Sequence, residues 1–124
     1  MYKPRILIVD DEENVRKALQ QWFQVCGFEV DIAEDGDIAV EKCTATEYDV
    51  VTMDMHMPRM SGTAAIAAIR VIRPEVPVIV FTGYYDNWDE AVQCGATKVL
   101  NKPMSLHDLE AEVRKFVTPE RLET

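Results

Sequence analysis

Cysteine, positive charge and long apolar runs are all scarce in this chain. Its three cysteines, Cys26, Cys43 and Cys94, form no CxxC pair, which argues against a disulfide framework or a zinc ribbon. Lysine and arginine number 13 against 22 aspartates and glutamates, so the net charge is −9. Proteins bind phosphate groups mainly through lysine and arginine. Direct binding to nucleic acid or to an acidic membrane surface is therefore unfavourable for this chain. No apolar stretch approaches the roughly 18 residues of a membrane span.

The remaining composition is that of one soluble globular domain. Apolar residues make up 48% of the 124 positions and charged residues 28%, which is typical of a core with a charged surface. The amino terminus leads into only four strongly apolar residues, too few for a signal peptide, so we expect a cytoplasmic location. We expect one domain over residues 1–119 and a tail or the start of a linker over 120–124.

Short apolar runs alternate with helical patterns along the chain. The runs are continuous, as in strands covered on both faces, except that the second alternates like an edge strand and the fifth is weak. Strands are predicted at residues 6–9, 28–32, 50–53, 78–81 and 98–101. Helices are predicted between and after them, at 15–23, 37–45, 65–72, 87–94 and beyond the N-cap Ser105.

This alternation predicts an α/β fold with a five-stranded parallel sheet and helices on both faces. Right-handed crossovers leave few topologies for such a chain. The usual one for five strands is the flavodoxin-like, doubly wound (βα)5 arrangement with strand order 2-1-3-4-5. In that arrangement a site forms at the carboxyl ends of the first and third strands.

Polar and charged residues follow the predicted strands at this edge. Asp10 and Asp11 follow the first strand and Asp54 the third, whereas Thr82 and Lys102 follow the fourth and fifth. Neighbouring carboxylates repel one another unless a cation lies between them, and Mg²⁺ suits oxygen ligands. The set therefore predicts phosphoryl transfer to Asp54. Lys102 is expected to pair with Asp54 and then, with Thr82, to bind the phosphoryl oxygens.

Each of these residues also has an ordinary structural explanation. Asp11 and the two following glutamates would favour the positive end of the next helix. Thr82 is a common strand residue, and Lys102 could be a surface lysine in a loop. The position of Asp54 after a buried strand, at the expected site, favours the functional interpretation.

Four motifs in order resemble the receiver domain of bacterial two-component response regulators. They are ILIVDD at 6–11, DMHMPRMSG at 54–62, FTG at 81–83 and KP at 102–103. The resemblance implies that Asp54 accepts a phosphoryl group from the phosphohistidine of a sensor histidine kinase or phosphotransfer protein. It implies a Mg²⁺ site made by Asp10, Asp11, Asp54 and the backbone carbonyl of His56. It also implies that the Lys102–Pro103 peptide bond is cis.

The resemblance further implies a signalling switch, not an enzyme with an external substrate. The chain would catalyse only its own phosphorylation and dephosphorylation. Phosphorylation would alter the surface of the fourth helix, fifth strand and fifth helix, and so control an output domain in cis or a protein target in trans. One departure is Val99, because receiver domains usually carry Tyr or Phe three residues before the lysine.

Three other functions compete with this interpretation. A haloacid-dehalogenase-like phosphatase also forms an aspartyl phosphate, but it needs a second aspartate where His56 stands. A flavodoxin needs a first loop that binds phosphate, which the acidic residues 10–13 would oppose. A receiver fold that no longer switches would be a pure interaction module. The complete set of site residues argues against this last alternative, and Val99 argues for it.

Overall fold

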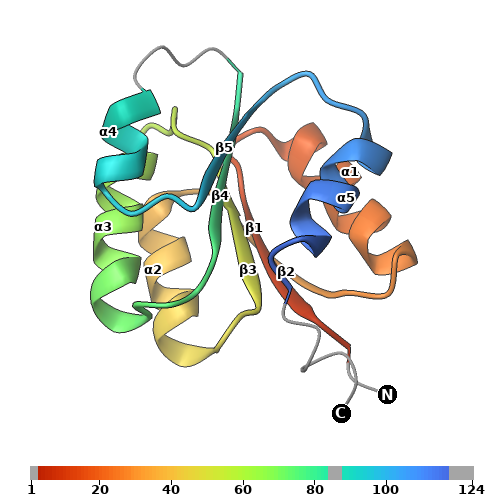
Figure 1. The fold of residues 1–124 in the computed structure, drawn as a ribbon, viewed down its shortest axis with the longest axis horizontal. Coiled ribbons are helices and arrows are strands. Elements are labelled where there is room, and N and C mark those ends of the chain that lie inside the picture. Colours follow the sequence, from red (N-terminus) through yellow and green to blue (C-terminus); the bar gives the residue numbers. More distant parts are fainter. Residues whose placement is uncertain (1–2, 84–87, 118–124) are drawn as a thin grey trace.

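A five-stranded parallel sheet is the middle layer of the molecule. The computed structural model describes residues 3–83 and 88–117, so the expected tail at 120–124 lies outside the described residues. The strand order is 2-1-3-4-5 and every neighbouring pair is parallel. Helices cover both faces of the sheet (Figure 1). The predicted flavodoxin-like doubly wound fold is therefore confirmed.

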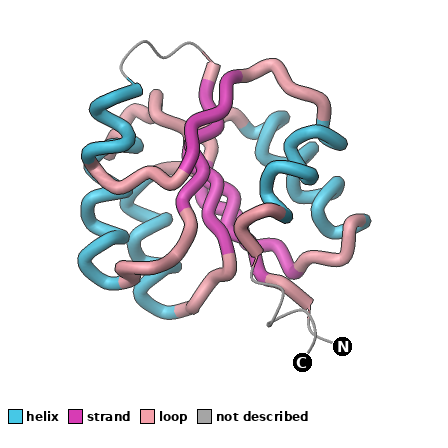
Figure 2. Tube along the Cα trace, in the orientation of Figure 1, coloured by secondary structure: helices cyan, strands magenta, loops and turns pink. Residues whose placement is uncertain are grey.

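Strands and helices alternate along the whole described chain (Figure 2). The strands are β1 (Arg5–Val9), β2 (Glu29–Ala33), β3 (Val50–Met53), β4 (Val78–Thr82) and β5 (Lys98–Asn101). The helices are α1 (Glu13–Val25), α2 (Gly36–Ala45), α3 (Gly62–Ile72), α4 (Trp88–Gln93) and α5 (Leu106–Arg114). In Figure 1, α1 and α5 lie on one side of the sheet and α2, α3 and α4 on the other. Within the described residues, none of these helices has the length and apolar character needed to span a membrane.

Side chains on the two faces of the sheet form two separate apolar cores. Alternate residues of one strand point to opposite faces, so Leu7 and Val9 pack with α2 and α3, whereas Ile6 and Ile8 pack with α1 and α5. Both sets are buried, which is why the central strands are apolar at every position. The edge strand β2 is only partly buried over most of its length, in keeping with its alternating sequence.

Short polar side chains begin three of the helices. The Ser105 hydroxyl accepts a hydrogen bond from the Asp108 amide at 3.0 Å, as the sequence predicts. Ser61 caps α3 in the same way, because its hydroxyl accepts a hydrogen bond from the Ala64 amide at 3.2 Å. Helix α3 therefore begins at Gly62, three residues before the predicted apolar pattern. Asp35 likewise begins α2. The position of Ser61 matters for the site, since it fixes the loop that follows β3.

Candidate functional site

Four strand ends meet at one edge of the sheet. The backbone pairing continues one residue past the strands, because the Asp54 amide donates to the Val9 carbonyl at 3.0 Å and the Lys102 amide to the Thr82 carbonyl at 2.7 Å. This pairing places the residue after β3 beside the end of β1, and the residue after β5 beside the end of β4. The predicted site residues therefore come together from distant parts of the chain.

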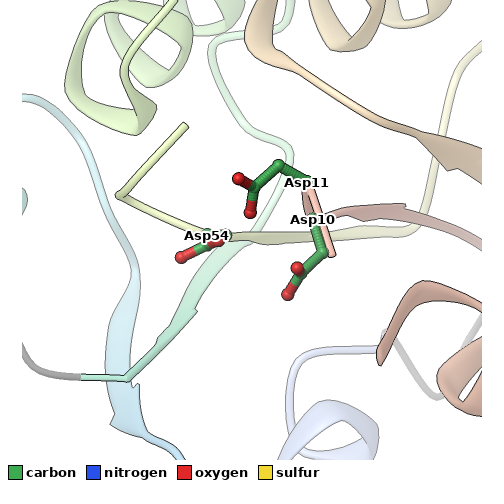
Figure 3. A group of neighbouring side chains, drawn as sticks. All are labelled: Asp10, Asp11 and Asp54. Atoms are coloured by element: carbon green, nitrogen blue, oxygen red, sulfur yellow. The ribbon is translucent and has the colours of Figure 1, made fainter. Parts of the chain in front are cut away.

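Three carboxylates form a cluster at this edge. One oxygen each of Asp10, Asp11 and Asp54 lies within 4.8 Å of the other two (Figure 3). Asp10 and Asp54 are 2% and 6% exposed, whereas Asp11 is exposed to solvent. The Glu12 amide donates to Asp10 Oδ1 at 2.9 Å and so fixes that side chain. Oxygen ligands gathered this closely, with one of them open to water, suit a hydrated Mg²⁺ ion.

Asp54 is a buried carboxylate held by hydrogen bonds. The Thr82 hydroxyl donates to Asp54 Oδ1 at 2.9 Å, and the His56 amide donates to the same oxygen at 3.3 Å. Burial raises the pKa of Asp54 above its ordinary value, and Asp10 adds to this. The Lys102 ammonium and the two hydrogen bonds act in the opposite direction and lower the pKa. The carboxylate is thus desolvated but also oriented, as a nucleophile should be.

The Lys102 side chain reaches the cluster but pairs with a different aspartate than predicted. Its Nζ lies 2.5 Å from Asp10 Oδ2, so the predicted pairing with Asp54 is wrong for this structure. Asp10 is the more deeply buried of the two carboxylates, and Asp54 already accepts the Thr82 hydroxyl. The ammonium also lies 5.5 Å from the centroid of the Phe81 ring, which packs beneath it. The Lys102–Pro103 peptide bond is cis, as the resemblance implies.

The loop between β3 and α3 lies directly against Asp54. A Cβ on Gly62 would lie 2.6 Å from the Asp54 carbonyl oxygen, so only glycine allows the helix to start this close. The imidazole of His56 is exposed, while its peptide group lies beside the Asp54 carboxylate. Arg59 ties the loop to the start of α2, because its Nη1 lies 3.5 Å from Asp35 Oδ2.

Gly62 and Arg59 belong to the motif at 54–62, but the sequence did not predict their structural roles at the site. The Ser-Gly pair at the start of an apolar helical pattern was a usable signal for Gly62. No local pattern predicts the ion pairs of Arg59, because its two carboxylate partners lie more than twenty residues earlier.

A family model described as the response regulator receiver domain matches residues 6–114. The chain belongs to this family. It is 40% identical over 113 residues to the regulatory protein AtoC of Escherichia coli K12. The matched region covers 90% of this chain and 24% of AtoC. It is 34% identical over 116 residues to the transcriptional regulatory protein PrrA of Mycobacterium leprae, covering 92% of this chain and 50% of PrrA. The chain thus spans from 24% to 50% of the length of these relatives.

Solved receiver domains have the same fold. A CheY-like response regulator receiver domain protein from Methanospirillum hungatei superposes with a TM-score of 0.91 at 27% identity, covering 98% of both chains. The response regulator TrrA of Thermotoga maritima, solved in complex with Mg²⁺ and BeF, superposes with a TM-score of 0.84 at 33% identity. That match covers 91% of this receiver domain and 98% of TrrA.

Proposed function

We propose that this receiver domain is the phosphoacceptor switch of a two-component system, and that Asp54 is the acceptor. The observation that carries this proposal is the surrounding of Asp54. A buried carboxylate accepts the Thr82 hydroxyl, lies beside two further aspartates and is within the field of the Lys102 ammonium. Phosphoryl transfer needs little more than such positioning and charge.

The donor in this proposal is the phosphohistidine of a sensor histidine kinase or phosphotransfer protein. An Asp54 carboxylate oxygen attacks phosphorus, so that an O–P bond forms while the N–P bond of the donor breaks. The bonding electron pair stays on the imidazole nitrogen. Thr82 Oγ1, now donating to Asp54, is placed to donate to a phosphoryl oxygen instead.

The three carboxylates and the backbone carbonyl of His56 would hold Mg²⁺. When bound, Mg²⁺ supplies charge neutralisation for the incoming phosphoryl oxygens. An Asp10 carboxylate that holds a metal no longer depends on the Lys102 ammonium for its neutralisation. Lys102, which is 21% exposed, can then turn toward the phosphoryl group.

The output of the switch is a shift between two conformations, with the surface of α4, β5 and α5 as the part that changes. Val99 of β5 is 7% exposed and packs in the core that α3 and α4 share with the sheet. It stands where most receiver domains have an aromatic side chain, so we assign the change to Thr82 and α4. The target is an output domain in cis or a protein in trans.

We also propose that the domain catalyses only its own phosphorylation and dephosphorylation. A cytoplasmic location is typical of the family and fits a kinase partner. With a net charge of −9, the domain itself is not suited to bind nucleic acid directly.

The proposal is tested by incubating the protein with acetyl phosphate and Mg²⁺ and measuring its intact mass. We expect the wild type to gain one phosphoryl group and Asp54→Asn to gain none. Asp49→Asn is the matched control, because Asp49 is an equally buried aspartate that accepts a hydrogen bond from the Arg5 amide and so lies at the other end of β1. Labelling of Asp54→Asn at the wild-type rate would overturn the assignment.

A further inference from the structure

The carboxyl end of α4 is closed by a well-formed helix-ending motif. Gly95 has a φ of 116°, its amide donates to the Val92 carbonyl at 3.1 Å, and the Ala96 amide donates to the Ala91 carbonyl at 3.0 Å. This pair of bonds satisfies the last carbonyls of the helix and reverses the chain at a glycine. The carbonyl of Gly95 itself is left to accept a hydrogen bond from elsewhere in the fold.

The donor to that carbonyl is Arg70, from the last turn of α3. Its Nε lies 2.9 Å from the Gly95 oxygen, and its Nη2 lies 3.3 Å from Thr97 Oγ1. The aliphatic stem contributes as well, since a Cβ on Gly95 would lie 2.7 Å from Arg70 Cγ. Arg70 therefore holds the segment after α4 in two ways: its aliphatic stem packs against Gly95, and its guanidinium donates hydrogen bonds to Gly95 and Thr97.

The same guanidinium also holds the turn between α3 and β4. Nη1 donates to the Val76 carbonyl at 2.5 Å and to the Arg73 carbonyl at 3.3 Å. Carbonyls at helix carboxyl ends carry partial negative charge, which a cation stabilises. A lysine could not reproduce this set of contacts, because the bonds leave three different nitrogens of a planar fork.

Thr97 connects this set of hydrogen bonds to strand β4 of the sheet. The Thr97 amide donates to the Val78 carbonyl at 2.7 Å, and its hydroxyl accepts from the Val78 amide at 3.0 Å. The end of α3, the start of β4 and the segment after α4 thus meet around one guanidinium. By contrast, among the described side chains of α4 (residues 89–93), Ala91 alone is buried.

We propose that Arg70 is a positioning residue of the switch that fixes the carboxyl end of α4, so that α4 responds to phosphorylation by a swing of its amino end about Gly95. The inference rests on the proposed function, because it takes α4 as part of the output surface. The amino end of α4 follows Thr82 by six residues, so a movement of Thr82 toward a phosphoryl group reaches that end first. The opposite end is tied to α3 through Gly95 and to β4 through Thr97.

The first test compares amide NMR spectra of the ¹⁵N-labelled wild type with and without beryllofluoride and Mg²⁺. We expect the amide signals of residues 89–91 to shift and those of 94–97 to stay close to their free positions. Equal shifts at both ends of α4 would overturn the proposal. If the amide signals of Asp54 and Thr82 do not shift, the result counts against the proposed function. The second test does not depend on that function.

The second test measures amide hydrogen exchange in the free protein. Arg70→Met keeps the apolar stem but removes the bonds, and we expect exchange at Gly95 and Ala96 to accelerate about tenfold or more. Arg70→Lys, which keeps the charge without the fork, should restore little of the protection.

Arg73→Met is the matched control for this comparison. Arg73 also lies at the end of α3, but its Nε donates to the Cys43 carbonyl of α2 at 2.9 Å and so ties α3 to α2. Exchange at Gly95 and Ala96 should therefore remain at the wild-type rate in Arg73→Met. Equal acceleration in Arg73→Met and Arg70→Met, or none in Arg70→Met and Arg70→Lys, would show that Arg70 is not the anchor.

Discussion

The side chain of Asp54 combines two opposing requirements. As the proposed nucleophile it must be ionised, yet it is only 6% exposed and lies beside Asp10. Burial raises its pKa, and the nearby Lys102 ammonium and Thr82 hydroxyl limit that rise. Ionised Asp54 is therefore a cost to folding, one that the proposed phosphoryl transfer requires.

This balance predicts that Asp54→Asn stabilises the metal-free protein at neutral pH. The pKa of Asp54 is higher in the folded than in the unfolded chain, so the folded state binds the proton more tightly. The penalty of the ionised form is present above that raised pKa and disappears as pH falls below the unfolded value. The free energy of unfolding in urea with EDTA should be larger for Asp54→Asn at neutral pH, and the difference should shrink on acidification.

The exposed Asp89→Asn is the control for the removal of one negative charge. It should change stability far less than Asp54→Asn, because the Asp89 carboxylate is already exposed to water in the folded state. A lower stability of Asp54→Asn than of the wild type at neutral pH would contradict the argument.

At the level of elements, the sequence predicted the fold well because continuous apolar runs and helical periodicity are local signals. All five strands and five helices lie where they were expected, with shifts at their ends. The start of α3 was predicted too late, since the capping role of Ser61 depends on one hydrogen bond and not on periodicity. The partner of Lys102 was predicted wrongly because the packing of side chains from three strand ends, and not the order of residues in the chain, brings its ammonium to Asp10.

The close contact between the start of α3 and the two residues after β3 predicts a large cost for Gly62→Ala. Its Cβ would lie 2.6 Å from the Asp54 carbonyl oxygen and 2.8 Å from Met55 Cα, and backbone atoms cannot move aside cheaply. We expect a loss of about 1–3 kcal/mol in the free energy of unfolding, measured by urea denaturation. Gly83→Ala is the control, because nothing lies within 4 Å of its Cβ position. Equal stability of the two variants would show that α3 can withdraw from Asp54.

At the scale of the whole molecule, the acidic cluster concentrates part of a net charge of −9 in one place. A cation bound there would relieve the full repulsion only in the folded state, because Asp54 is far from Asp10 and Asp11 in the unfolded chain. Binding of Mg²⁺ at the proposed site would therefore be linked to global stability through the same three side chains. This linkage makes the metal site measurable without any phosphodonor.

We therefore predict that Mg²⁺ raises the melting temperature in a way that ordinary salt does not. A ligand at 100 times its dissociation constant adds about 2.7 kcal/mol, which for a domain of this size is about 10 °C. Sodium chloride at the same ionic strength is the control, since screening of a negative chain also stabilises it. Asp10→Asn starts from a lower melting temperature because Lys102 loses its partner, so the shift on adding Mg²⁺ is the quantity to compare. The rise in melting temperature on adding Mg²⁺ should be small in Asp10→Asn. A rise as large as in the wild type would mean that the cation binds away from the carboxylates at the ends of β1 and β3.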